Sequence, residues 1–214
     1  MENTKLIERF EAEMAKIHRT GIEDLITYIR QSDFFTAPAS TRFHLSCPGG
    51  LLQHSINVLD ALRGLLDWNE NEQIWEYRVA GHVVDSASDE SVTLMALLRD
   101  VCKINFYSVR SHTVKNQETG QWEEKPYYVV EDQMPLGHGD KSVLLISKYI
   151  NLTDQELYSI WHHMGFVGQD YAALKSVDLS IQKHPMVLAL QTADMMASKL
   201  MEGNEENCFE AEKV

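Results

Sequence analysis

A carboxylate interrupts the apolar face of the last long helix that the sequence predicts. Asp194 falls in a stripe with helical spacing whose other members are Val187, Leu190, Ala197 and Met201. An unpaired buried carboxylate is very costly, so Asp194 must be paired, protonated or bound to a metal ion. This requirement constrains the fold, because a partner has to meet Asp194 in the core.

His54 creates the same problem on a second predicted helix. The apolar members of its stripe are Leu51, Val58, Leu62 and Leu65. Histidine and aspartate are both metal-ligand types, and here they face the core from separate helices. The pair therefore indicates a site inside a helical bundle.

Length and composition fit one ordinary domain. The chain has 214 residues, of which 44% are hydrophobic and 24% are charged, so disorder is excluded as the main interpretation. The formal net charge is −13 with neutral histidines. This charge argues against a protein that tracks extended nucleic acid, which needs a basic face. It still allows a small nucleotide, or a strand end held by a metal ion.

Cysteine usage and hydropathy bear on the compartment. Cys47, Cys102 and Cys208 have no CxxC spacing and indicate reduced thiols. The first residues are charged and lack the apolar segment of a signal peptide. No apolar run approaches the roughly 20 residues that span a bilayer. We therefore expect a cytoplasmic protein with no membrane partner.

The predicted organisation is a single helical domain over residues 1–203, followed by an acidic tail at 204–214. N-terminal helices are expected in residues 1–35, and the core in residues 40–203. Beta-favouring segments flank NQETGQW, so residues 107–130 predict a small β-hairpin, which could lie as a flap near the site. The predicted fold class is mainly α, a helical bundle with this hairpin inserted.

Two predicted helices begin with clear capping signals. Ser88 is a plausible N-cap, and Thr153 forms a capping box with Glu156. The second of these helices carries His162 and His163. Adjacent helical residues point about 100° apart, so these two histidines need not share a role.

Seven residues are candidate metal ligands because their side chains offer nitrogen or oxygen donors. They are, in chain order, His44, His54, Asp100, His138, His162, His163 and Asp194. Imidazole and carboxylate together suit transition metals such as Mn, Fe, Co, Ni or Zn. No cysteine accompanies them, which argues against a structural zinc cage.

Five short motifs follow one another in a familiar order. They are GGLLQHS, LMALLRDVCKI, GHGDKS, WHHMG and LQTAD, and they span about residues 40 to 200. In this order the chain resembles the HD-domain superfamily of metal-dependent phosphohydrolases, most closely the HD proteins of phages and bacteria. The resemblance implies an HD-like helical core and a divalent metal cofactor: Mn, Mg, Fe, Co, Ni or Zn.

The resemblance also assigns roles to individual residues. It implies that His54 is the first metal ligand, that Asp100 is the aspartate of the His-Asp pair and that Asp194 is the last ligand. Lys103 matches a lysine that faces phosphate. Further ligands of two-metal members fall at His138, His162 and His163.

Arg99 departs from the family pattern, which has histidine at this position. Arginine carries a permanent charge and cannot coordinate a metal, so a mononuclear site would be weakened or lost. A second metal position could survive on the other histidines. Alternatively, Arg99 could pair with Asp100 or Asp194, with no metal at all, or it could clamp a phosphate bidentately.

The leading functional hypothesis is a metal-dependent phosphohydrolase that acts on a nucleotide, another small phosphate compound or a nucleic-acid end. Asp100 would hold the metal or orient the water, and Lys103 and Arg99 would stabilise charge on the phosphoryl oxygens. The alternative is a non-catalytic nucleotide-binding or protein-binding module on the same fold, in which Arg99 replaces the metal's charge.

Overall fold

The computed structural model describes residues 2–116, 119–166 and 170–202. The predicted acidic tail lies outside these residues. Eight α-helices are described, with a short 3-10 helix, η1 (Val101–Lys103), and a π-helical turn, η2 (Ala197–Met201). The α-helices are α1 (Glu2–Met14), α2 (Ile22–Gln31), α3 (Gly50–Leu65), α4 (Asp89–Leu98), α5 (His138–Ser147), α6 (Asp154–Trp161), α7 (Tyr171–Lys183) and α8 (Met186–Met196).

The fold is mixed α/β, so the prediction of a mainly α bundle is wrong. Of the described residues, 50% are helical, and 17% are strand in two small antiparallel sheets. The sheet that was missed has the order β1 (Asp67–Asn69), β2 (Ile74–Val79) and β3 (His82–Ser88). The sequence carries a signal for this sheet on β2, where Trp75, Tyr77 and Val79 alternate with Glu76 and Arg78. The run is short, and most side chains on the three strands are exposed or half-buried.

Local chemistry explains why this sheet forms. Ala80 and Gly81 connect β2 to β3 with φ of 49° and 83°, the left-handed pair that a tight two-residue hairpin turn requires. Trp68 and Trp75 lie opposite each other on β1 and β2, with ring centroids 5.1 Å apart. Cross-strand aromatic pairs of this kind stabilise small antiparallel sheets.

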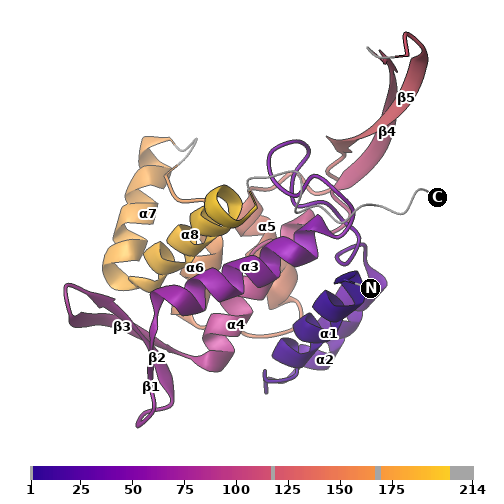
Figure 1. Ribbon diagram of the computed structural model, residues 1–214. Coiled ribbons are helices and arrows are strands. Elements are labelled where there is room, and N and C mark those ends of the chain that lie inside the picture. Colours follow the sequence, from indigo (N-terminus) through magenta and orange to yellow (C-terminus); the bar gives the residue numbers. More distant parts are fainter. Residues whose placement is uncertain (1, 117–118, 167–169, 203–214) are drawn as a thin grey trace.

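The second sheet is the predicted hairpin, formed by β4 (Tyr107–Lys115) and β5 (Trp122–Val130). It extends away from the helices at the opposite end of the molecule from β1–β3 (Figure 1). Its base is tied to the body, where the Tyr107 hydroxyl donates to the Ala39 carbonyl at 3.3 Å. The hairpin therefore stands as an arm and does not cover the helical core as a flap would.

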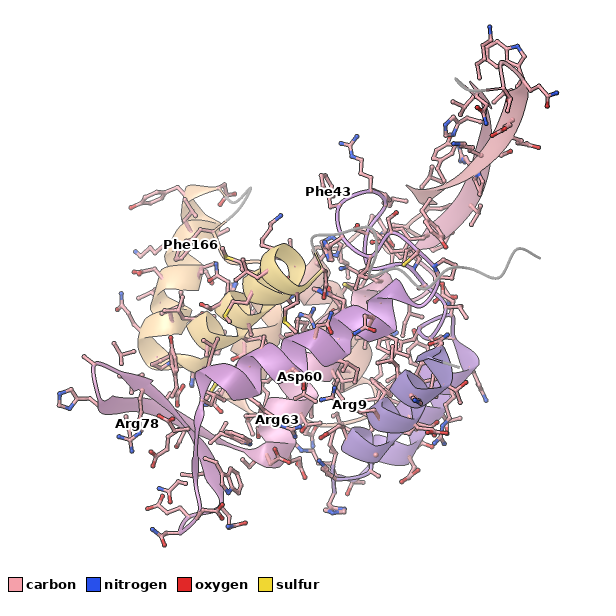
Figure 2. The ribbon with its side chains drawn as sticks, in the orientation of Figure 1. Arg9, Phe43, Asp60, Arg63, Arg78 and Phe166 are labelled. Atoms are coloured by element: carbon pink, nitrogen blue, oxygen red, sulfur yellow. The ribbon has the colours of Figure 1, made fainter. Side chains whose placement is uncertain are left out.

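Helix α3 is the central element of the fold. It packs against α8 and α4, and α1 lies along its other side (Figure 1). Arg9 on α1 and Asp60 on α3 face each other across this contact, where Arg9 Nη1 donates to Asp60 Oδ2 at 2.9 Å (Figure 2). His54 lies on the buried face of α3, and only 2% of this residue is exposed.

Both predicted caps are confirmed. The Ser88 hydroxyl accepts from the Ser91 amide at the start of α4. Thr153 and Glu156 form the full capping box at the start of α6. Glu156 is also clasped by Arg19, whose Nη1 and Nη2 donate to its two oxygens at 2.7 and 2.6 Å. These contacts fix α6, which carries the two adjacent histidines at its end.

Candidate functional site

The structure brings His54, Asp100 and Asp194 together from three different elements. His54 Nε2 lies 3.0 Å from Asp194 Oδ1 and 3.5 Å from Asp100 Oδ2. The three donor atoms lie within 4.8 Å of one another, so they form a group that could hold a metal ion. Their separation in sequence is bridged because α3, α4 and α8 share one core.

The guanidinium of Arg99 lies beside both carboxylates of this group and neutralises their charge. The side chain is fully buried, and its Nε and Nη2 donate to Asp194 Oδ1 at 3.2 and 3.0 Å. Nη2 lies 3.3 Å from Asp100 Oδ2, and Nη1 donates to the Ala96 carbonyl at 2.7 Å. The two carboxylate oxygens that would ligate a metal are thus the two that Arg99 neutralises. A divalent ion does not fit this group while Arg99 keeps its place.

Glu202 is a site residue that the sequence analysis missed. Its side chain is fully buried, and both carboxylate oxygens lie within 3.0 Å of His54 Nδ1. The π-helical turn Ala197–Met201 explains the omission, because its extra residue per turn advances the face of the helix. Met201 was predicted to face the core, but it is 39% exposed and Glu202 is 3% exposed.

Both ring nitrogens of His54 therefore face carboxylates. A carboxylate only accepts hydrogen bonds, so with no metal bound both nitrogens must carry protons and His54 is an imidazolium. Burial and the nearby Arg99 charge oppose this, but Asp194 and Glu202 outweigh them and raise the pKa of His54 above its usual value. His54 is therefore a cation in this state.

Lys103 is drawn into the same cluster. Its Nζ lies 3.1 Å from Asp100 Oδ2, and its side chain is 12% exposed. Burial opposes ionisation of Asp100, but the charges of Lys103 and Arg99 hold the pKa of Asp100 well below its usual value. The cluster therefore contains three carboxylates and three cations and is neutral without a metal. The cations are Arg99, Lys103 and His54, and the carboxylates are Asp100, Asp194 and Glu202.

The other oxygen of Asp100 has a different environment. Asp100 Oδ1 lies 3.5 Å from His163 Nε2, and His163 Nδ1 lies 2.7 Å from the Ile160 carbonyl oxygen. Because that carbonyl can only accept, Nδ1 carries a proton, and Nε2 is the ring nitrogen that faces Asp100. This buried Nε2 has no hydrogen-bond partner within the described part of the chain. A buried imidazole nitrogen and a buried carboxylate oxygen thus face each other at 3.5 Å, a separation that leaves Nε2 without a hydrogen bond.

His138 and His162 occupy different positions beside this pair. His138 Nδ1 lies 3.4 Å from Cys102 Sγ, and burial, despite the Asp100 charge, lowers the pKa of His138. His162 contacts α7, where its Nε2 lies 3.3 Å from Ser176 Oγ. Both histidines line a hollow of about 450 Å³ between α5, α6 and α7. The adjacent His162 and His163 therefore contact different groups.

Two glycines allow the close approaches that build the site. A Cβ at Gly50 would lie 2.1 Å from the Leu45 carbonyl oxygen, so only glycine lets the loop carrying His44 rest on the start of α3. A Cβ at Gly139, next to His138, would lie 1.9 Å from the Trp161 carbonyl oxygen. The GHG motif is thus a contact between α5 and the end of α6.

No protein-family model, no curated protein and no solved structure matches this chain. The resemblance to the HD-domain superfamily therefore stays a prediction. Among the described residues, no helix is long and apolar enough to cross a membrane.

Proposed function

We propose that this protein is a metal-dependent phosphohydrolase, with its divalent ion held on the Oδ1 side of Asp100. The substrate is the phosphate ester of a nucleotide, of another small molecule or of a nucleic-acid end. One observation carries the proposal: His163 Nε2, which has no hydrogen-bond partner among the described residues, faces Asp100 Oδ1 in the protein interior. The order of motifs that resembles the HD-domain superfamily agrees with it.

The donors on this side suit a transition metal. Ligands bound at about 2.0–2.2 Å from an ion lie roughly 3.0–3.6 Å apart, and the Asp100–His163 separation is 3.5 Å. The Ile160 carbonyl holds the far nitrogen of His163, as outer-shell partners of metal-bound histidines do. His138, whose pKa is lowered by burial, is the further imidazole that could join them. One carboxylate with imidazoles favours Mn, Fe, Co, Ni or Zn over Mg.

The bound metal would activate a water molecule and polarise a phosphoryl oxygen. The chain's own residues hold Asp100 in place for this. Arg99 cannot serve as a phosphate clamp here, because it is fully buried and its donors are used by Asp194 and Ala96. Lys103 is partly exposed and has N–H groups beyond the one that meets Asp100, so it is the cation that would meet a phosphate oxygen.

A second candidate function is a non-catalytic nucleotide-binding module. The observation that favours it is the internal charge balance around Arg99, which removes the need for a metal between His54 and Asp194. This candidate predicts that nucleotides bind without metal and are not hydrolysed.

The test is a panel of phosphodiester and nucleotide substrates assayed with added Mn²⁺, Co²⁺, Ni²⁺ or Mg²⁺. We expect metal-dependent hydrolysis by the wild type. Loss of an inner ligand in His163→Ala should reduce the rate by more than the roughly 10- to 100-fold typical of outer-shell changes. The control is His82→Ala, on an exposed position of β3. Nucleotide binding without hydrolysis under any metal would favour the binding module instead.

A further inference from the structure

A second group of donors lies on the other side of His54, away from Asp100. It consists of His44 in the loop before α3, His54 on α3 and Glu202 after the π-helical turn. The side chains of His54 and Glu202 are 2% and 0% exposed, and that of His44 is 18% exposed. Three segments that are distant in sequence therefore place ligand-type groups in one enclosed space.

Hydrogen bonding does not explain the position of the His44 ring beside Glu202. Its Nε2 is buried and has no hydrogen-bond partner among the described residues. The nearest carboxylate oxygen, Glu202 Oε2, is 3.9 Å away, too far for a hydrogen bond. The His44 and His54 rings lie 4.6 Å apart, and no direct bond between their nitrogens accounts for the contact. The geometry leaves His44 Nε2 directed at Glu202 with a gap between them.

We propose that His44, His54 and Glu202 form a transition-metal site, distinct from the Asp100–His163 position. The ion would take His44 Nε2, His54 Nδ1 and a Glu202 oxygen as ligands. It would replace the proton that His54 Nδ1 shares with Glu202, and that proton leaves to solvent. Two imidazoles with one carboxylate form a donor set that suits Zn²⁺.

The surroundings of His54 match those of a metal-bound histidine. When Nδ1 binds the ion, Nε2 keeps its proton and donates to Asp194 Oδ1 at 3.0 Å. Such a carboxylate–histidine–metal arrangement orients the ring and strengthens the bond to the ion. The Asn57 amide donates to Glu202 Oε1 at 2.8 Å and fixes the carboxylate in the same way. Each of these two ligands thus already has an outer-shell partner.

The metal site would link Glu202 and His44 to the central helix α3, which carries His54. Glu202 comes directly after the π-helical turn, and His44 lies in a loop held over α3 by the close contact at Gly50. An ion shared by these residues would fasten both segments to α3. Metal binding would therefore hold the His44 loop and the end of η2 in place beside the Arg99 cluster.

The experiment measures Zn²⁺ stoichiometry and affinity by calorimetry, together with the visible spectrum of the Co²⁺-substituted protein. The proteins are the wild type, His44→Ala, Glu202→Gln, His163→Ala and the control His82→Ala. We expect His44→Ala and Glu202→Gln each to lose one equivalent of Zn²⁺ or to weaken its binding by at least about 10- to 100-fold. His163→Ala should keep this equivalent, which separates the result from any failure of the phosphohydrolase proposal.

Folding is checked by circular dichroism, and His44→Gln replaces His44→Ala if the alanine variant does not fold. Unchanged Zn²⁺ stoichiometry and affinity in the folded His44 variant would overturn the proposal. So would a wild type that binds no Zn²⁺, or one whose only Zn²⁺ is lost in His163→Ala.

Discussion

Replacement of Asp194 by alanine distinguishes an ion-pair role from a metal-ligand role. In the structure Asp194 Oδ1 accepts from Arg99 Nε and Nη2 and lies 3.0 Å from His54 Nε2. The variant leaves the fully buried Arg99 without its main partner and gives the cluster a net positive charge. Breaking one side of a buried ion pair costs roughly 3–5 kcal/mol. The Asp194 side chain is 18% exposed, which places the expected loss toward the lower end of that range.

The assay is a thermal melt combined with elemental analysis. A chain of this size loses about 2–4 °C per kcal/mol, so Asp194→Ala should melt about 6–20 °C lower than the wild type. It should still bind metal at both proposed positions, because neither ion uses Asp194 as a ligand. Loss of the carboxylate behind His54 should only weaken the His44–Glu202 site, by roughly 10- to 100-fold. Met195→Ala is the matched control, since it changes an exposed neighbour on the same helix. In Asp194→Ala/Arg99→Met the loss should be smaller than the sum of the single losses.

The opposite pattern would refute this reasoning. If Asp194→Ala lost metal and activity but melted near the wild-type temperature, Asp194 would be a metal ligand. The pairing with Arg99 would then not describe the working state of the protein.

Three further predictions concern other charges. Arg99→His should add one equivalent of bound metal beside Asp100, measured by metal titration. The gain should grow from acidic toward neutral pH, because the new imidazole binds metal only after it loses its proton. No gain at any pH would contradict the view that Arg99 blocks this position. Arg19→Ala leaves the fully buried Glu156 carboxylate unpaired and should cost roughly 3–5 kcal/mol in urea unfolding, whereas a loss below about 1 kcal/mol would show that the clasp is marginal. Burial alone would raise the pKa of Glu13, but hydrogen bonds led by Arg63 lower it to about 2. The ionised Glu13 therefore stabilises the fold above pH 4.5, and this stabilisation is lost as the pH falls toward 2. Unfolding free energies of the wild type and Arg63→Met should differ above pH 4.5 and converge in acid.

Local signals in the sequence predicted the helix starts and the hairpin because these depend on neighbouring residues. The Ser88 cap and the Thr153–Glu156 capping box satisfy backbone donors within one turn. The hairpin at 107–130 follows from two β-favouring segments around a turn glycine. The position of the hairpin, away from the core, depends on tertiary contacts that the sequence pattern does not contain.

The rest of the structure has only a weak local signal or none. The sheet β1–β3 is marked only by the five-residue alternation of Trp75 to Val79 on β2, and most of its side chains are exposed or half-buried. Glu202 reaches the core through a π-helical turn, which shifts the helical period by one residue. The pairing of Arg99 was one of several alternatives that the sequence left open. Only the positions of α4 and α8 in space bring Asp194 Oδ1 to its guanidinium, which also meets Oδ2 of the next residue, Asp100.

The central claim is that the catalytic ion binds on the Oδ1 side of Asp100 while Arg99 keeps the other side. Anomalous diffraction at the manganese edge, from crystals grown with Mn²⁺, tests it directly. The account predicts a peak between Asp100 Oδ1 and His163 Nε2, with Arg99 still paired to Asp194. A peak between His54, Asp100 and Asp194 with Arg99 displaced, or no peak beside Asp100, would contradict it.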